Sequence, residues 1–160
     1  MPDTKVRALD APALLEEDHS HFRDLFEGYQ QLGDGPRPSK QELFELLRRE
    51  MAVHAVLEED IFYPAIEHAN DRKARRAVED ARLEHRAVKS ILAELGALTP
   101  DDAAFDLKMD VLRETVLHHG EEEEREMFRI FRHLPPEIRE DVSDRLRSRK
   151  QELTSLFEPQ

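Results

Sequence analysis

Apolar side chains recur along this chain at spacings of three, four and seven residues, which is the repeat of amphipathic α-helices. Turn-forming residues, chiefly Gly, Pro, Asn and Asp, interrupt the repeat at intervals. We therefore expect five helices, over residues 11–32, 39–69, 71–95, 99–133 and 136–156. Because the connections among the first four are short, neighbouring helices should run antiparallel. The pattern predicts an all-α fold, an up-down-up-down four-helix bundle with an additional short C-terminal helix.

Local signals predict two of the helix starts and one irregularity. Ser39 followed by Glu42 is the sequence of a capping box, which predicts the start of the second helix. Thr99 followed by Pro100 predicts the start of the fourth. Pro64 lies inside the second helical repeat, and because it has no amide hydrogen it should kink or loosen the helix there.

Length and composition are those of one compact helical unit. The chain has 160 residues, of which 39% are hydrophobic and 38% charged, and this size suits a single core. We expect a bundle domain over residues 11–134 and a helical extension over 135–158. The extension is mostly charged, and we expect it to pack on the same domain as a lid or brace, with a surface that could receive a protein partner.

Charge and cysteine content exclude several classes of function. The net charge is −12, so we expect neither nucleic acid nor an anionic membrane as a partner. No apolar run approaches the roughly 20 residues that span a bilayer, and the first ten residues lack the pattern of a signal peptide. We expect a cytoplasmic protein. The absence of Cys excludes disulfides, iron–sulfur clusters and Cys-ligated zinc.

Histidines mark the buried face of each of the four main helices. Four of the eight histidines fall on the apolar stripes, one in each helix: His19, His54, His85 and His119. Glu58 and Glu123 lie four residues after the second and the fourth of these, which is one helical turn along the same face. A carboxylate inside a core needs a compensating cation or strong donors. Imidazole together with carboxylate suits iron, manganese or zinc.

The ligand pattern also repeats along the chain. Asp18-His19 precedes His54-x-x-x-Glu58, and about 65 residues later Glu84-His85 precedes His119-x-x-x-Glu123. Two helices thus supply one His each, and two supply a His and a Glu each. This order predicts a pseudo-twofold site with two similar metals.

These motifs resemble those of the hemerythrin-like proteins, also called HHE cation-binding domains. The resemblance covers residues 14–134, and Glu58-Glu59 leading to Tyr63-Pro64 also belongs to it. It implies a non-haem centre of two Fe ions, oxo- or hydroxo-bridged, with Mn or Zn as other metals. By the same resemblance Glu58 and Glu123 would bridge the metals. His19 and His54 would bind one, and His85 and His119 the other.

One departure from the family affects the ligand set. Oxygen-carrying hemerythrins have a further His one turn before the position of His85, and Ala81 stands there. Asp80, Glu84 or water could take the place of that ligand. The resemblance implies binding or sensing of O2, NO or peroxide. The alternatives are an enzyme that turns over peroxide or NO, for which the free position argues, and a non-catalytic metal-storage or interaction bundle.

The remaining histidines and acidic residues have simpler interpretations. His118 with Glu122 repeats the four-residue spacing but lies on a polar face, and we expect it to be solvated. We also expect His21 to lie on the surface and His68 and His133 to lie near helix ends. Asp18 and Glu84 adjoin ligands and could orient an imidazole through its other nitrogen, or could simply face solvent. Phe22, Phe26, Phe62 and Tyr63 are assigned to the core, with some lining the pocket.

Overall fold

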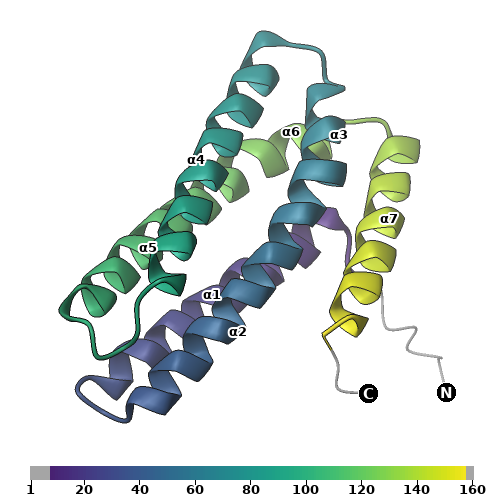
Figure 1. The fold of residues 1–160 in the computed structure, drawn as a ribbon. Helices are drawn as coiled ribbons and strands as arrows, with labels where there is room; N and C mark the ends of the chain where they lie inside the picture. The colour runs from purple at the N-terminus through teal and green to yellow at the C-terminus, as the bar shows by residue number, and fades with distance from the viewer. Residues whose placement is uncertain (1–7, 158–160) are drawn as a thin grey trace, which may run out of the picture.

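The computed structural model describes residues 8–157, and its ordered elements are all helices (Figure 1). Residues 1–7, and residue 158 at the end of the expected extension, lie outside the described range. The long helices are α1 (Ala11–Leu32), α2 (Arg37–Leu57), α4 (Arg72–Gly96) and α5 (Ala103–Glu122). α2 continues through the π-helical turn η1 (Glu58–Phe62) into α3 (Tyr63–Glu67), and α5 continues through η2 (Glu123–Met127) into α6 (Phe128–Arg132). With α7 (Pro136–Ser155), this confirms a four-helix bundle and an additional C-terminal helix.

Two predicted helix starts are wrong. α2 begins at Arg37, two residues before Ser39, and no side chain caps it, so the capping box does not form. α5 begins at Ala103 rather than after Thr99. The carboxylate of Asp102 accepts a hydrogen bond from the Thr99 amide at 2.7 Å, which closes a turn ahead of the helix. Thr99 thus belongs to a turn ahead of its helix, while Ser39 lies inside α2, after the helix has already begun.

The irregularity expected at Pro64 has a different cause. The departure from α-helical geometry precedes Pro64: the Tyr63 amide bonds to the Glu58 carbonyl, an i→i+5 bond. The same bond joins Phe128 to Glu123 in η2, where Arg129 stands in the place of the proline. Proline is therefore not required for the turn. π-helical turns inside α-helices are often found at functional sites, and here each begins at one of the two buried glutamates.

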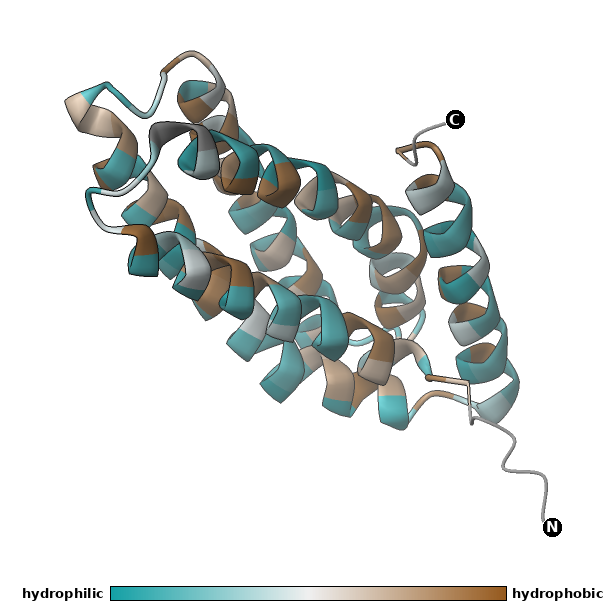
Figure 2. Cartoon of the chain, turned by 90° about the horizontal axis from the view of Figure 1, so that it is seen from below, coloured by the Kyte–Doolittle hydropathy of each residue, from teal (hydrophilic) through white to brown (hydrophobic). Residues whose placement is uncertain are grey.

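The core is divided into two apolar clusters along the bundle. One contains Leu15, Leu57 and Phe62 with residues of α6 and α7, and the other contains Phe26 and Phe105 near the α1–α2 turn. Hydrophobic colour accordingly follows the inner faces of the helices (Figure 2). The buried histidines fall between the two clusters in sequence order on every long helix, so a polar layer separates them.

Helix α7 lies against α1, α2 and η1 at one end of the bundle (Figure 1). Val142 and Leu146 belong to the first apolar cluster. The Ser143 hydroxyl accepts a hydrogen bond from the Ala11 amide at 2.9 Å, and Arg147 donates to the Leu9 carbonyl. The buried side chains hold α7 against the bundle, and the two hydrogen bonds set its position along α1.

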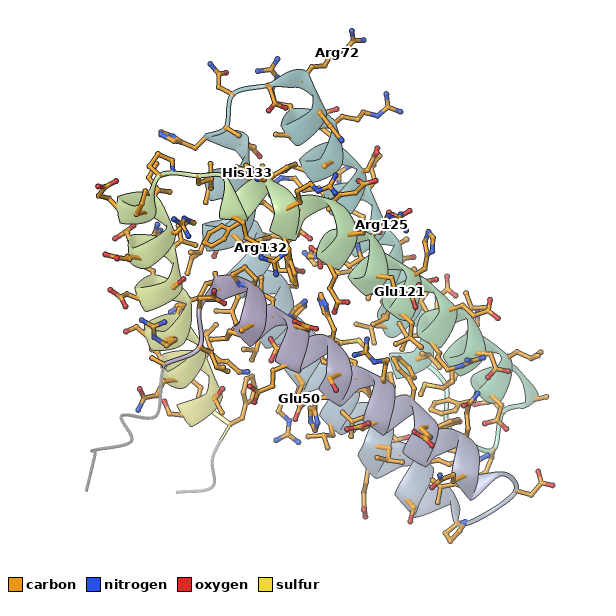
Figure 3. The ribbon with its side chains drawn as sticks, turned by 180° about the vertical axis from the view of Figure 1, so that it is seen from behind. Glu50, Arg72, Glu121, Arg125, Arg132 and His133 are labelled. Atoms are coloured by element: carbon orange, nitrogen blue, oxygen red, sulfur yellow. The ribbon has the colours of Figure 1, made fainter. Side chains whose placement is uncertain are left out.

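The outer surface is charged. Arg72 and Arg125 project from α4 and η2 away from the bundle (Figure 3). Within residues 8–157, no helix combines the length and the apolarity needed to cross a bilayer.

Leu146 of α7 is fully buried against the bundle, so Leu146→Ala should leave a cavity. We expect the variant to lower the free energy of unfolding by about 2–5 kcal/mol, measured by urea denaturation of the metal-free protein. Leu156, also on the C-terminal side, is 73% exposed and serves as the control. Leu156→Ala should change the stability by no more than about 0.5 kcal/mol. Equal effects of the two substitutions would show that α7 does not belong to the core.

Candidate metal centre

The structure brings together all six side chains of the predicted ligand set. They come from α1, α2, α4 and α5 and from the first residues of η1 and η2. Glu58 is 0% exposed and Glu123 is 2% exposed, although both are carboxylates. The four histidines are equally buried, at 5–6% exposure: His19, His54, His85 and His119.

These side chains form two groups of four that share both glutamates. One group contains His19 and His54 with Glu58 and Glu123, and the other contains His85 and His119 with the same two glutamates. Within each group, one ligand atom per residue lies within 4.8 Å of all the others. The grouping gives each candidate position two imidazoles and two shared carboxylates.

Several inner atoms of the site have no hydrogen-bond partner. They are His19 Nε2, His54 Nε2, Glu58 Oε2 and Glu123 Oε1. A buried polar atom that makes no hydrogen bond costs about 1–3 kcal/mol. Yet imidazole nitrogens and carboxylate oxygens lie close together here: His19 Nε2 is 3.2 Å from Glu123 Oε1, and His54 Nε2 is 3.1 Å from Glu58 Oε1. Imidazole nitrogens and carboxylate oxygens without hydrogen-bond partners, converging from several helices, are atoms that could coordinate a metal ion.

A second carboxylate faces the outer nitrogen of each histidine. Asp18 lies 2.8 Å from His54 Nδ1, and Glu84 lies 2.5 Å from His119 Nδ1. Glu124 lies 3.1 Å from His19 Nδ1, and Glu59 lies 3.6 Å from His85 Nδ1. A carboxylate on one imidazole nitrogen orients the ring and raises the basicity of the other nitrogen. The alternative that Asp18 and Glu84 merely face solvent is therefore wrong.

The outer carboxylates obey the same pseudo-twofold relation as the inner set. Asp18 and Glu84 precede a histidine in sequence and bond to the histidine of the next long helix. Glu59 and Glu124 directly follow the shared glutamates and face histidines of the other half of the chain. Each half therefore holds part of the other half's site.

The charges of the metal-free site compensate one another. Burial alone would lower the pKa of His54, but the charge of Glu58 and the hydrogen bond to Asp18 raise it to about 10. Burial likewise opposes protonation of His119, while Glu123, Glu58 and Glu84 raise its pKa to about 11. Protons on these two imidazoles thus take the place of metal charge.

The pKa values of the two shared glutamates are shifted in opposite directions. Burial would raise the pKa of Glu58, but the charge of His54 and the close approach of three imidazoles, of which His85 is hydrogen-bonded at 3.0 Å, hold that pKa well below its ordinary value. Burial raises the pKa of Glu123, and the neighbouring charge of Glu58 raises it further. Two carboxylates this close do not both ionise readily without a cation between them.

The Tyr63 hydroxyl, like the Glu124 carboxylate beside His19, is a part of the site that the sequence pattern does not reveal. The hydroxyl lies 3.0 Å from His85 Nε2, 3.3 Å from His119 Nε2 and 2.6 Å from Glu123 Oε2. The expected core position is thus correct, and the hydroxyl in addition points into the second group. In a regular α-helix a residue five positions after Glu58 turns away from its face. The wide turn η1 brings it back.

The Tyr63 hydroxyl lies beside His85 and His119, in the half of the site where the resemblance implied a further ligand in place of Ala81. Of the other residues considered for that place, Asp80 is exposed and pairs with Arg76, and Glu84 bonds the outer nitrogen of His119. The twin of Tyr63 in the second half is Phe128, whose ring stacks parallel to His19 with centroids 6.2 Å apart. The two groups are therefore alike in His and Glu but differ by one hydroxyl.

The other histidines lie where the polar pattern places them. His118 is exposed and pairs with Glu122 at 3.1 Å, and His21 is exposed and pairs with Glu50 at 2.7 Å. His68 and His133 are exposed at helix ends.

An apolar pocket of about 440 Å³ opens between α2 and α4 and reaches all four buried histidines. Glu59 and Lys89 line it as an ion pair with nitrogen–oxygen distances of 3.1 Å. Its apolar walls include Phe22, Met51, Ala55, Val88, Leu92 and Val116. Between α1 and α5 the helices approach closely, because Gly120 packs against the ring of His19 and a Cβ there would lie 3.2 Å from that ring. A smaller pocket of about 100 Å³, lined by residues of α4, α5 and η2, reaches His119 and Glu123 from another side.

A helical bundle with interior clusters of His and Glu is a protein that could hold metal ions. The chain belongs to the hemerythrin HHE cation binding domain family, whose model matches residues 10–131. The resemblance inferred from the motifs is thereby confirmed, and the match ends before α7.

Curated relatives include proteins of two bacterial groups. Uncharacterized proteins of Mycobacterium tuberculosis and Mycobacterium bovis are 26% identical over 150 residues, covering 91% of this chain and 88% of theirs. A DNA nickase of Nostoc is 27% identical over 120 residues, covering 74% of this chain. This chain spans about a third of that relative's length, 32%.

A solved structure has the same fold. The crystal structure of an HHE cation binding domain-containing protein from Mycobacterium kansasii superposes with a TM-score of 0.72 at 22% identity. The superposition covers 92% of this chain and 88% of that one.

The pKa shifts predict how the metal-free protein responds to pH. His54 and His119 have pKa values raised from 6.5, so their protonation stabilises the fold fully below about pH 6.5, and this is lost as pH rises toward 10 and 11. The melting temperature of the metal-free protein should therefore fall between pH 6.5 and pH 10. Metal should reverse the trend, because ligands must lose their protons to bind it.

The measurement is thermal unfolding of the metal-free protein across this pH range. His118→Ala removes an exposed histidine and should leave the profile unchanged. A melting temperature that stays level up to pH 10 would contradict the charge arrangement described for the site.

Proposed function

We propose that this chain holds two iron ions in the polar layer of its bundle and binds or senses a small oxidant: O2, NO or peroxide. The observation that carries the proposal is the pair of buried four-residue groups that share Glu58 and Glu123. Sharing two carboxylates suits two adjacent cations, because each carboxylate has one oxygen for each ion.

The residues would provide ligands for two metal positions. His19 and His54 would hold one ion, His85 and His119 the other, and Glu58 and Glu123 would bridge them. The Tyr63 hydroxyl would complete the second position. A pair of iron ions of this kind supplies the electrons that binding or reduction of O2, NO or peroxide requires.

The surroundings support a small uncharged ligand. The pocket between α2 and α4 leads to the histidines along largely apolar walls, where an ion would lose most of its hydration and a small uncharged molecule such as O2, NO or undissociated peroxide would not. Beside His19, the counterpart of Tyr63 is Phe128, which has no hydroxyl. The first position therefore has one protein donor fewer than the second, and the ligand would bind there.

The second candidate is an enzyme that turns over peroxide or NO. It is favoured by the contact between the Tyr63 hydroxyl and Glu123 at 2.6 Å, because the pKa of this carboxyl is raised by burial and by Glu58. Together they form a proton donor and acceptor inside the site. Sustained consumption of peroxide or NO, against a single stoichiometric reaction, separates this candidate from the first.

The test of the proposed function is iron binding by matched double variants. We expect about two irons per chain after anaerobic loading, and new near-ultraviolet absorption when air is admitted. His54→Ala with Glu58→Ala should remove most of the iron, because it takes one imidazole and a shared carboxylate. His118→Ala with Glu122→Ala removes a pair of the same type and spacing from the surface, and should bind like the parent.

A parent protein that takes up less than one metal per chain would sink the proposal. If both double variants keep full iron, the iron lies elsewhere than between these side chains, and the alternative of a storage or interaction bundle is favoured.

Tyr63→Phe tests the proposed role of the hydroxyl. The ring stays, so the packing of Tyr63 in the core should survive, and the free energy of unfolding of the metal-free protein should change by less than about 1.5 kcal/mol. We expect the affinity for the second iron to fall by about tenfold or more, measured by competition with a chelator. Visible absorption from iron–phenolate contact should be present in the parent and absent in the variant. If both spectra and affinities agree, Tyr63 is not a ligand.

A further inference from the structure

Two hydrogen bonds link helix α7 to the metal centre. The Lys150 ammonium donates to Asp18 Oδ1 at 2.6 Å, and Asp18 Oδ2 accepts from His54 Nδ1 at 2.8 Å. A carboxylate is a rigid planar group, so a bond that fixes one oxygen also fixes the direction of the other.

We propose that Lys150 is a positioning residue for His54, through which α7 sets the orientation and donor strength of one metal position. The proposal rests on the proposed function, because it assigns His54 to the ligand set. It goes beyond the family match, which ends at residue 131 and does not include α7.

The register of α7 supports this role. Ser143, Leu146 and Lys150 lie three and four residues apart, so they share one face of the helix. Ser143 bonds the start of α1 and Leu146 is fully buried, which places Lys150 one turn further along α1. Asp18, also on α1, lies two turns after the Ala11 amide that Ser143 binds. The two anchors thus hold Lys150 over Asp18.

The link is specific to one metal position. Glu84 is the twin of Asp18 and bonds His119, but within residues 8–157 no lysine or arginine forms an ion pair with it. Lys89 does pair with Glu59, but Glu59 stands 3.6 Å from His85 Nδ1, beyond hydrogen-bond distance. Loss of Lys150 should therefore affect His54 and spare His119.

Lys150 can be replaced without loss of the fold. Its side chain is 34% exposed and lies on the wall of a cavity of about 460 Å³ between α1, α2 and α7. Lys150→Met keeps the apolar stem and opens no void in the core. Lys150→Arg keeps the charge and should restore the parent behaviour at least in part.

The first measurement uses the metal-free protein. In ¹⁵N-edited NMR, exchange of the His54 Nδ1–H proton with water should become about fivefold faster in Lys150→Met, the effect of losing about 1 kcal/mol of hydrogen-bond ordering. The corresponding proton of His119 is the internal control and should not change. Arg149→Met removes the same charge from the adjacent position of α7, where Arg149 pairs with Glu152, and should also leave His54 unchanged.

The second measurement is the release of iron to a chelator from the loaded protein. In Lys150→Met one of the two irons should leave about tenfold faster and the other at the parent rate. Unchanged exchange of the His54 proton, or equal acceleration at His119, would overturn the proposal. A protein that binds no iron would overturn the proposed function, while the NMR measurement would still decide the role of Lys150.

Discussion

The burial of two carboxylates in the middle of an apolar core is the constraint on which this structure depends. Glu58 and Glu123 lie where water cannot solvate them, so a cation must be supplied from within the bundle. Without metal, protons on His54 and His119 would supply it, in keeping with their raised pKa values. Ion binding and protonation thus compete for the same site. The two apolar clusters on either side provide the packing that holds this costly layer together.

The His and Glu side chains of the site are arranged almost symmetrically, and two features break that symmetry: the Tyr63 hydroxyl and the pocket between α2 and α4. Both positions receive two imidazoles and share two carboxylates, and each imidazole faces an outer carboxylate. Tyr63 then distinguishes one position, and its twin Phe128 leaves the other without a hydroxyl. The apolar pocket between α2 and α4 reaches all four buried histidines, whereas α1 and α5 approach each other closely at Gly120. Small differences between equivalent residues therefore decide where a ligand would bind.

Helical periodicity predicted most of the fold and the six clustered side chains, because the side-chain repeat is regular up to Glu58 and Glu123. It failed where the backbone departs from that repeat. Tyr63 was assigned to the core, in a group of which some residues were expected to line the pocket, but not to the ligand set. A regular helix would turn its hydroxyl away, and the wide turn η1 aims it inward. A tyrosine at the fifth position after a buried Glu would have been the signal. The cap expected at Ser39 does not form because α2 begins two residues earlier, and at Thr99 a turn closed by Asp102 precedes the helix. The partners of Asp18 and Glu84 depend on which helices lie side by side, which spacing within one helix does not encode.

The exchange of carboxylates between the halves has a consequence for the order of events during folding. Both groups need Glu58 from the first helical hairpin and Glu123 from the second, so neither hairpin alone contains a complete site. The first hairpin leaves the ribosome with half a set of donors and nothing to enclose them. Under the proposed function, capture of two ions would therefore wait until the hairpins have docked, and metal loading would be the last step of maturation.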